Sequence, residues 1–186
     1  MAFQLDTFVA DCKAAVHETD SQEAIRELLA QAISNPSEIL SELGTPELGG
    51  LTPLYHADDL TILNIVWGPG MTLHPHNHCM WANIGIYGGQ EENNFFQRTP
   101  DGLVQNGQAL LEEKHVAPLH EDVIHSVHNP LGKLTAAIHV YGGDFFGAPR
   151  SDWDPDTLEE RPFDIERTKA CFEEANARML AEQKGN

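Results

Sequence analysis

Two kinds of hydrophobic periodicity divide the chain, and the change comes after a pair of glycines near residue 50. Before it, apolar residues recur every three or four positions in 3–16 and again in 21–34, which is the spacing of one face of a helix. Pro36 opens a shorter helical stretch that Gly44 closes. None of these segments carries a catalytic pattern, so we expect residues 1–50 to form a helical cap packed on a sheet.

Between Leu51 and about Gly147 the chain changes to short runs rich in Ile, Val, Thr, Tyr and Trp. Turn residues separate these runs, for example at 68–70, 100–102 and 106–107. Many short strands at this spacing predict a sandwich or a double-sheet jelly-roll barrel. The expected strands are 60–67, 72–79, 81–87, 93–98, 103–105, 108–117, 123–127 and 134–141.

The last part of the chain begins as an acidic segment with several prolines and ends in a helical stripe over residues 164–183, which Asp164 is placed to cap. The length of 186 residues fits one domain with a substantial core. We therefore expect a single domain over 1–186, composed of a helical cap at 1–50, a barrel at 51–150 and an arm with its helix at 151–186.

Composition and charge restrict the partners. The chain has 29 acidic residues against 11 lysines and arginines, which gives a formal net charge of −18. Nucleic acids and anionic membranes are bound through basic patches, so this charge argues against both as partners. Any site for an anionic ligand must therefore be local. The sequence predicts no particular oligomeric state.

Cysteine usage and the N-terminus indicate a cytoplasmic protein. Cys12, Cys79 and Cys171 are few, odd in number and scattered, so they predict no disulfide framework and a reducing compartment. The N-terminus lacks the basic and apolar regions of a signal peptide. No stretch approaches the roughly 18 apolar residues that a membrane-spanning helix needs.

The stretch with the most chemical potential follows the turn at 68–70, where His74, His76 and His78 occupy every second position. Alternate residues of a strand point to one face, and neutral imidazole is the commonest metal-binding side chain. Three ligands from one strand exceed what one ion easily accepts, so we expect His76 and His78 to bind metal and His74 to lie at the rim. The alternative is a histidine-rich edge strand without metal.

A metal held by two histidines needs at least one further ligand. His125 is the best candidate, because it lies in a separate expected strand. No acidic residue occurs between His78 and Gly89, and we expect Glu91 and Glu92 after that turn to face solvent. The predicted site therefore has three histidines, and it favours anionic ligands because neutral imidazoles leave the charge of the ion uncompensated.

A third segment shares these features. Ala137, His139 and Tyr141 lie on one face of an expected strand, where the phenol can donate to a bound ligand or oxygen species; an ordinary buried pair is the alternative. Arg150 can bind a carboxylate if it lies near a pocket, although a surface salt bridge is the commoner role. Cys79 is expected to be a buried thiol, because its parity turns it away from the ligand face.

Over residues 55–150 the chain resembles the cupin superfamily, and within it the thiol dioxygenases related to cysteine dioxygenase. Gly70, followed after five residues by His76-Asn77-His78, matches the first cupin motif. His125, in the segment IHSVHNP, stands at the third metal histidine of that family.

Two further matches concern the surroundings of the metal. His139 and Tyr141 match the last two members of the Ser-His-Tyr relay of these enzymes. Arg150 falls where the 3-mercaptopropionate dioxygenase branch has its carboxylate-binding arginine. The resemblance implies a double-stranded β-helix (jelly-roll) barrel and a non-haem Fe(II) bound by three histidines. It also implies a small thiol and O₂ as substrates and a sulfinate as product.

Three departures from the family leave other functions open. Ala137 stands at the serine of the relay, Ala57 lies near the substrate arginine of cysteine dioxygenases, and Gly85 stands at the cysteine that animal enzymes cross-link to tyrosine. We therefore expect no cross-link, and cysteine is a doubtful substrate. The alternatives are a dioxygenase of carbon acids such as β-diketones, a Lewis-acid lyase or isomerase, and a non-catalytic metal-binding cupin.

Overall fold

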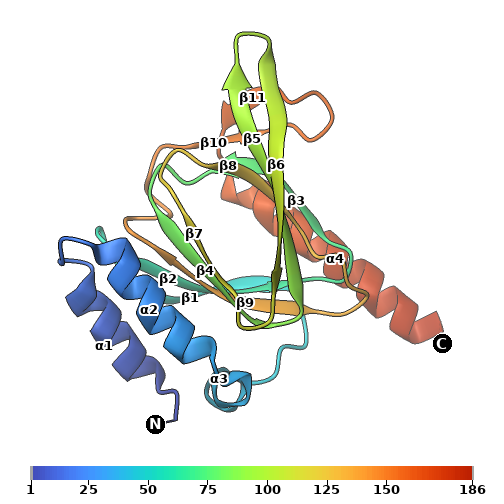
Figure 1. Cartoon of the computed structure of the whole chain (residues 1–186). Helices are drawn as coiled ribbons and strands as arrows, with labels where there is room; N and C mark the ends of the chain where they lie inside the picture. Colours follow the sequence, from blue (N-terminus) through green and yellow to red (C-terminus); the bar gives the residue numbers. More distant parts are fainter. Residues whose placement is uncertain (1, 186) are drawn as a thin grey trace.

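The computed structural model describes residues 2–185, and its strands form two antiparallel sheets packed face to face (Figure 1). The strands are β1 (Gly50–His56), β2 (Thr61–Trp67), β3 (Thr72–Asn77), β4 (Ala82–Gly88), β5 (Gln90–Thr99), β6 (Gly102–Glu112), β7 (Val116–Leu119), β8 (Ile124–His128), β9 (Thr135–Tyr141), β10 (Ser151–Trp153) and β11 (Glu160–Pro162).

The strand order within each sheet defines the architecture. One sheet has the order β1-β2-β9-β4-β7, and the other has the order β11-β10-β3-β8-β5-β6. From β2 to β5 successive strands alternate between the sheets, and β2 pairs with β9, β3 with β8, and β4 with both β7 and β9. This is a jelly-roll barrel, in which the chain winds as a double-stranded β-helix. The predicted cupin barrel with N-terminal helices and a C-terminal helix is confirmed.

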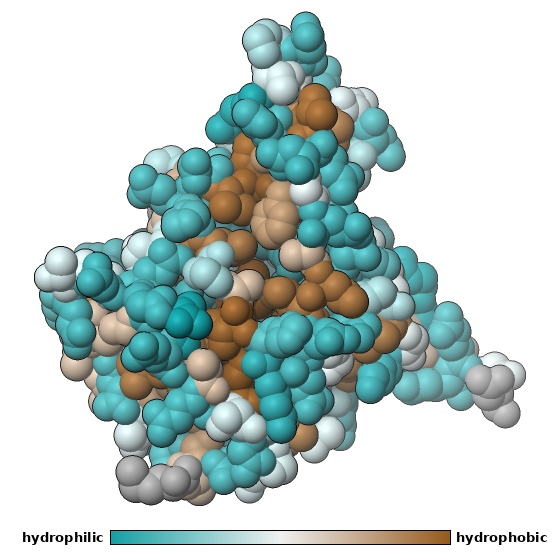
Figure 2. Space-filling model, in the orientation of Figure 1, coloured by the Kyte–Doolittle hydropathy of each residue, from teal (hydrophilic) through white to brown (hydrophobic). Residues whose placement is uncertain are grey.

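The interior of the barrel is filled by apolar side chains from both sheets. Figure 2 shows such side chains gathered between the sheets, surrounded by a hydrophilic surface. Alternation along each strand explains this placement, since every second residue points inward. The inward-facing members of this cluster include Leu63, Ile65, Trp67, Leu73, Ile84 and Val127.

The N-terminal helices cover the outer face of the five-stranded sheet (Figure 1). They are α1 (Leu5–Ala15), α2 (Ser21–Ile33) and α3 (Pro36–Leu43), and their apolar stripes form a second buried cluster with that sheet. The approach of α2 is close: a Cβ at Gly85 would lie 2.7 Å from Cγ of Leu29. The glycine therefore makes room for the helix.

Two expectations about strands were wrong. Residues 106–107 form no turn, because β6 runs through them; Phe95 pairs with Gly107 and Phe96 with Gln105, which leaves Asn106 as the extra residue of a β-bulge. In addition, β1, β10 and β11 were not predicted. Both β1, which contains Pro53, and β11 are edge strands, where proline and weak strand propensity are tolerated.

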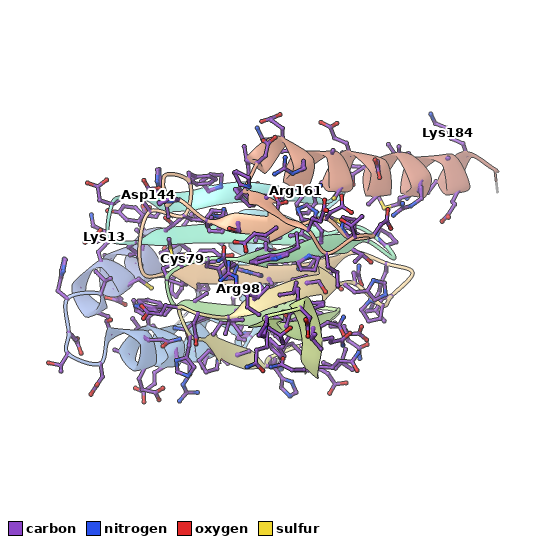
Figure 3. The ribbon with its side chains drawn as sticks, turned by 90° about the horizontal axis from the view of Figure 1, so that it is seen from above. Lys13, Cys79, Arg98, Asp144, Arg161 and Lys184 are labelled. Carbon is purple, nitrogen blue, oxygen red and sulfur yellow. The ribbon has the colours of Figure 1, made fainter. Side chains whose placement is uncertain are left out.

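The C-terminal helix α4 (Ile165–Gly185) lies over one side of the barrel, and its last turns extend beyond the sheets (Figure 3). It buries Thr168 and Phe172. Oδ1 of Asp164 accepts a hydrogen bond from the backbone nitrogen of Glu166 at 3.0 Å, which confirms the predicted cap. No helix in the described part of the chain combines the length and apolarity needed to cross a membrane.

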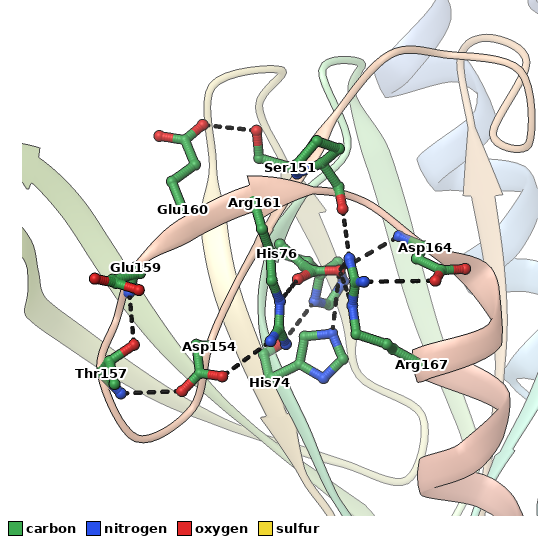
Figure 4. Close-up of polar contacts among 12 residues, drawn as sticks. His74, His76, Ser151, Asp154, Thr157, Glu159, Glu160, Arg161, Asp164 and Arg167 are labelled. Atoms are coloured by element: carbon green, nitrogen blue, oxygen red, sulfur yellow. Dashed lines mark hydrogen bonds and ion pairs between the residues drawn. The ribbon is translucent and has the colours of Figure 1, made fainter.

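A buried carboxylate ties α4 to the strand that carries the histidine motif (Figure 4). Asp152 is fully buried, and it accepts hydrogen bonds from Arg161 Nε at 2.5 Å and from Arg167 Nη2 at 2.8 Å. His74 Nε2 lies 3.6 Å from the same carboxylate, and Asp152 pairs with His76 across β3 and β10. This network therefore joins β3, β10, β11 and α4 around one charge.

We expect Asp152→Asn to lower the free energy of unfolding by about 3 kcal/mol, because it removes one partner of a buried ion-pair network. Burial raises the pKa of the Asp152 carboxyl, but hydrogen bonds from Arg161 and Arg167 outweigh it and leave the pKa lowered. The contribution is therefore complete above the unfolded-state pKa of about 3.9 and is lost as the pH falls through the lower folded value. Denaturant unfolding at neutral and at acidic pH measures both effects.

Asp156→Asn is the matched control, because Asp156 is exposed in the connection between β10 and β11. It should change the free energy of unfolding by less than about 0.5 kcal/mol. Equal destabilisation by the two substitutions would contradict the role of the Asp152 network.

Candidate metal centre

Three histidines from two neighbouring strands meet in the interior of the barrel. His76 and His125 are paired directly across β3 and β8, and His78 follows the end of β3. All three are buried, and one nitrogen of each lies within 4.8 Å of the corresponding nitrogens of the other two. Nε2 of His78 lies 3.3 Å from Nε2 of His125. The structure thus brings together the three histidines that the sequence singles out, in a group that can hold a metal ion.

Hydrogen bonds at the opposite ring nitrogens direct two of these imidazoles, those of His76 and His125. Nδ1 of His76 lies 3.1 Å from the carbonyl oxygen of His74, and Nδ1 of His125 lies 2.6 Å from Oδ1 of Asn93. Oxygen can only accept here, so each Nδ1 carries the proton and each Nε2 keeps its lone pair. Metal-binding histidines are oriented in this way by their second nitrogen. Asn93 is a site residue that the sequence analysis missed.

Burial keeps these rings uncharged. Burial is the main cause that lowers the pKa of His125 to about 4 and those of His76 and His78 well below their usual value; the neighbouring His125 ring lowers the last two further. At neutral pH the site therefore presents neutral imidazoles, which suit iron, zinc, copper and nickel. The donor chemistry fits a metal ion that keeps further coordination positions for a ligand.

Two neighbours of the motif differ from expectation. His74 is buried rather than at the rim; it faces Asp152 and lies outside the group of three histidines. Cys79 is exposed, so the predicted buried thiol was wrong. The reason is local, because β3 ends at Asn77 and Cys79 adopts a left-handed backbone with φ of 56°. Strand parity no longer applies to it.

His139 and Tyr141 lie beside the histidine group. Both line the same cavity, and Nδ1 of His139 is 3.1 Å from Oη of Tyr141. The Tyr141 ring packs against His78 and Phe145, with ring centres 5.0 and 4.4 Å away. Burial raises the pKa of Tyr141, so its hydroxyl keeps its proton at neutral pH. Ala137, fully buried in the same strand, offers no hydrogen bond to this pair.

Glu91 is the largest departure from expectation, since we predicted that it faces solvent and it is fully buried. Its carboxylate accepts hydrogen bonds from Trp67 Nε1 at 2.7 Å and from Asn93 Nδ2 at 2.9 Å. Nε2 of His139 lies 3.5 Å away. The cause is the start of β5 at Gln90, earlier than predicted, which turns Glu91 and Asn93 inward. If the predicted strand had begun directly after Gly88 and Gly89, alternation would have placed Glu91 and Asn93 on one face.

Arg150 also departs from the expected surface salt bridge. It is buried, lines the cavity with the three histidines and forms no ion pair within residues 2–185. Its Nη2 donates to the carbonyl of Phe145 at 3.1 Å, and its guanidinium lies 3.5 Å from the ring centre of Phe163. Burial lowers the pKa of Arg150 to about 10, so it stays charged at neutral pH. Its Nε has no hydrogen-bond partner.

The cavity beside the histidines is small, with a volume of about 20 Å³. That is room for roughly one water molecule. Leu51, Thr168 and Phe172 separate it from a groove of about 330 Å³ that lies between β1 and α4. Thr168 Oγ1 is buried in this wall without a hydrogen-bond partner. The groove therefore adjoins the cavity at this wall.

Two positions that the resemblance singles out lie elsewhere. Gly85 faces Leu29 of α2 on the outer side of the sheet, and the strand partner of Tyr141 is Ala82. No thiol therefore stands opposite the phenol on β4. Ala57 lies in the β1–β2 connection and does not line the cavity, whereas Leu51 of β1 does.

No family model matches the chain. It is similar to a solved RmlC-like cupin family protein with a double-stranded β-helix fold from Methanocaldococcus jannaschii, at 12% identity over 54% of this chain and 84% of that one, with a TM-score of 0.45. An uncharacterised conserved protein with a double-stranded β-helix domain from Klebsiella pneumoniae matches at 11% identity over 63% and 81%, with a TM-score of 0.43. A cupin superfamily protein from Desulfitobacterium hafniense matches at 12% over 54% and 82%, with a TM-score of 0.44. These matches assign no reaction, and the strand order defines the fold.

We expect the protein to bind one divalent metal per chain and His125→Ala to weaken binding by more than about 100-fold, since removing only an outer partner of a ligand costs about 10–100-fold. Asn93→Ala should weaken metal binding by about 10–100-fold, because it removes the hydrogen bond that orients the His125 ring. Titration of metal-free protein with Fe(II) under anaerobic conditions, and with Zn(II), measures these affinities.

His128→Ala serves as the control, because His128 lies on the same strand and turns its Nδ1 to Met71 O and Thr72, away from the group. The metal affinity of the His128→Ala variant should match that of the unsubstituted protein. Unchanged affinity in His125→Ala would remove this histidine from the metal site.

Proposed function

We propose that this protein is a non-haem iron dioxygenase that oxidises a small thiol bearing a carboxylate to its sulfinate with O₂. One observation carries the proposal: three buried neutral imidazoles, a protonated phenol and a buried guanidinium without an acid partner surround one cavity. His76, His78 and His125 would hold the iron. Tyr141 and Arg150 would contact the substrate.

The charges around the cavity support an anionic substrate. Three neutral imidazoles add no negative charge to the two positive charges of Fe(II), and Arg150 adds another cation next to them. Glu91 supplies one negative charge against these three positive ones. A buried cation without a partner is unfavourable, so the site favours a ligand that brings negative charge. A thiolate with a carboxylate on the same small molecule brings two. This attraction is local, which agrees with the net charge of −18.

Each residue of the site has a separate task in the proposed reaction. Bound iron would supply the place where the thiolate and O₂ meet, so that both oxygen atoms pass to sulfur. Arg150 would bind the carboxylate through its N–H groups and fix the orientation of the thiol. Tyr141 would hold a proton at Oη, as a hydrogen-bond donor that His139 orients. Phe145 and Phe172 exclude water from the cavity.

The substrate would reach the cavity from the groove between β1 and α4. Leu51, Thr168 and Phe172 line both spaces, and the inner space is smaller than a thiol substrate. A shift of these side chains would join them. A reducing cytoplasm, which we propose as the location, would keep such a thiol reduced.

A metal-dependent enzyme with different chemistry is the second candidate, because the three-histidine donor set also suits zinc acting as a Lewis acid. An iron enzyme that oxidises a carbon acid such as a β-diketone would use the same ligands. O₂ uptake by iron-loaded protein, measured against a thiol panel and a diketone panel, separates these functions. A non-catalytic metal-binding protein would turn over neither panel.

In the proposed reaction, Arg150→Ala should raise KM at least about tenfold for a carboxylated thiol, since a hydrogen bond to a charged group contributes about 1.5–3 kcal/mol. KM for a neutral thiol of similar size should change little. Steady-state O₂ uptake with both thiols gives the comparison.

Arg150→Lys provides the control for charge, because lysine keeps the cation and loses the planar fork. It should recover part of the affinity for the carboxylated thiol. Since Arg150 is buried, circular dichroism and metal content must first show that each variant is folded and loaded. Equal effects on both thiols would exclude a carboxylate-binding role.

A further inference from the structure

We infer that Glu91 is a positioning residue of this site. It anchors His139 and Tyr141 in place of the serine that is absent at residue 137, and it supplies negative charge next to the metal from outside the set of metal ligands. The second part of the inference needs only the metal centre, whereas the first part rests on the proposed function. The two parts can be tested separately.

Glu91 is a fully buried acid without a lysine or arginine partner in the described part of the chain. Hydrogen bonds from Trp67 and Asn93 favour its ionised form. A buried carboxylate in that state needs a nearby positive charge. A metal ion held by the three histidines would supply positive charge on this side of the site.

Glu91 lies on the side of the His139 ring that faces away from Tyr141. Its Oε2 faces Nε2 of His139 at 3.5 Å, while Nδ1 on the other side of the ring lies 3.1 Å from Tyr141 Oη. A carboxylate that faces one nitrogen of an imidazole keeps the proton on that nitrogen. Nδ1 then accepts from the phenol and fixes its direction. At 3.5 Å the Glu91 contact is longer than a hydrogen bond, so a small rotation of the ring would complete it.

Ala137, the neighbour of His139 on the same face of β9, cannot orient its ring. Ala137 lies two residues before it on the same face of β9, fully buried, where a methyl group offers neither donor nor acceptor. Glu91 instead approaches the ring from β5 in the opposite sheet. A carboxylate–imidazole–phenol arrangement thus takes the place of a hydroxyl–imidazole–phenol one.

Two hydrogen bonds through Asn93 connect Glu91 to the candidate metal ligand His125. Asn93 Nδ2 donates to Glu91 Oε1 at 2.9 Å, and Asn93 Oδ1 accepts from His125 Nδ1 at 2.6 Å. The carboxylate fixes which end of the amide faces the histidine. Such outer partners make a ligand histidine a stronger donor. Glu91 therefore acts on the metal through Asn93 and His125.

The experiment for the metal part compares Glu91→Gln with Glu92→Gln. Glu92 is the neighbouring acid, only half-buried and on the opposite face of β5, where it accepts from Asn94. In iron-loaded protein without substrate, loss of the Glu91 charge should disfavour the more positive Fe(III) by at least tenfold. That is a rise of about 59 mV in the midpoint potential. Glu92→Gln should leave the potential unchanged, and equal potentials in the two variants would overturn this part.

The experiment for the relay uses thiol-dependent O₂ uptake by the same variants. Glu91→Gln should lower kcat at least about tenfold, as removal of outer partners does, with KM changed less than about twofold. Adding Ala137→Ser to Glu91→Gln should restore part of kcat, because the hydroxyl returns to the face of β9 that carries His139. An unchanged kcat in Glu91→Gln, or a double variant no better than the single one, would overturn the relay role.

These readouts separate the inference from the proposed function. If the unsubstituted protein oxidises no thiol, the proposed function fails, and the comparison of potentials still decides whether Glu91 acts on the metal. Metal content and the thermal unfolding midpoint, measured first, show that Glu91→Gln is folded and loaded. If it does not load iron, Zn(II) affinity replaces the potential, and the inference then requires weaker binding than in Glu92→Gln.

Discussion

The pairing of β3 with β8 is the constraint on which the site depends. It sets His76 directly opposite His125, in a barrel interior that excludes water. Burial makes the charged form of each ring unfavourable, so the imidazoles remain neutral with their lone pairs directed at one point. A one-residue slip in register would turn every side chain of β3 to the other face. Strand register and metal chemistry are therefore one property of this fold.

Around this point the barrel holds two buried charges of opposite sign that do not neutralise each other. Arg150 lies toward Phe145 and Phe163, whereas Glu91 lies toward Trp67 and Asn93. Trp67 and Asn93 donate hydrogen bonds to Glu91, whereas Nε of Arg150 has no partner. Within residues 2–185 neither charge forms an ion pair with a lysine, arginine, aspartate or glutamate. Buried charges kept apart in this way leave the site strongly polar across its width. A bound metal ion would supply positive charge for Glu91, and a bound anion would supply negative charge for Arg150.

The sequence was most informative where regular structure decides the outcome. Alternation in a strand placed His74, His76 and His78 on one face, and a separate expected strand supplied His125. The resemblance then assigned His139, Tyr141 and Arg150 to the same site. The errors fall where regularity stops or where a partner decides burial. Cys79 lies past the end of its strand, and Glu91 is buried because Trp67, Asn93 and His139 surround it. Strand alternation could have placed Glu91 on the inner face, but charged residues are usually exposed, so its burial as a charged group depends on these tertiary partners.

The C-terminal helix links the outer architecture to the site. Asp152 binds Arg167 of α4 and lies opposite His76, so any movement of α4 acts on the network that borders the ligand strand. The same helix carries Thr168 and Phe172, which close the cavity toward the groove. If a ligand enters from the groove, the side chains of this wall must move, while the Asp152 network keeps β3 in place. A fold with access on this side can admit a ligand without disturbing the strand pairing that orients its histidines.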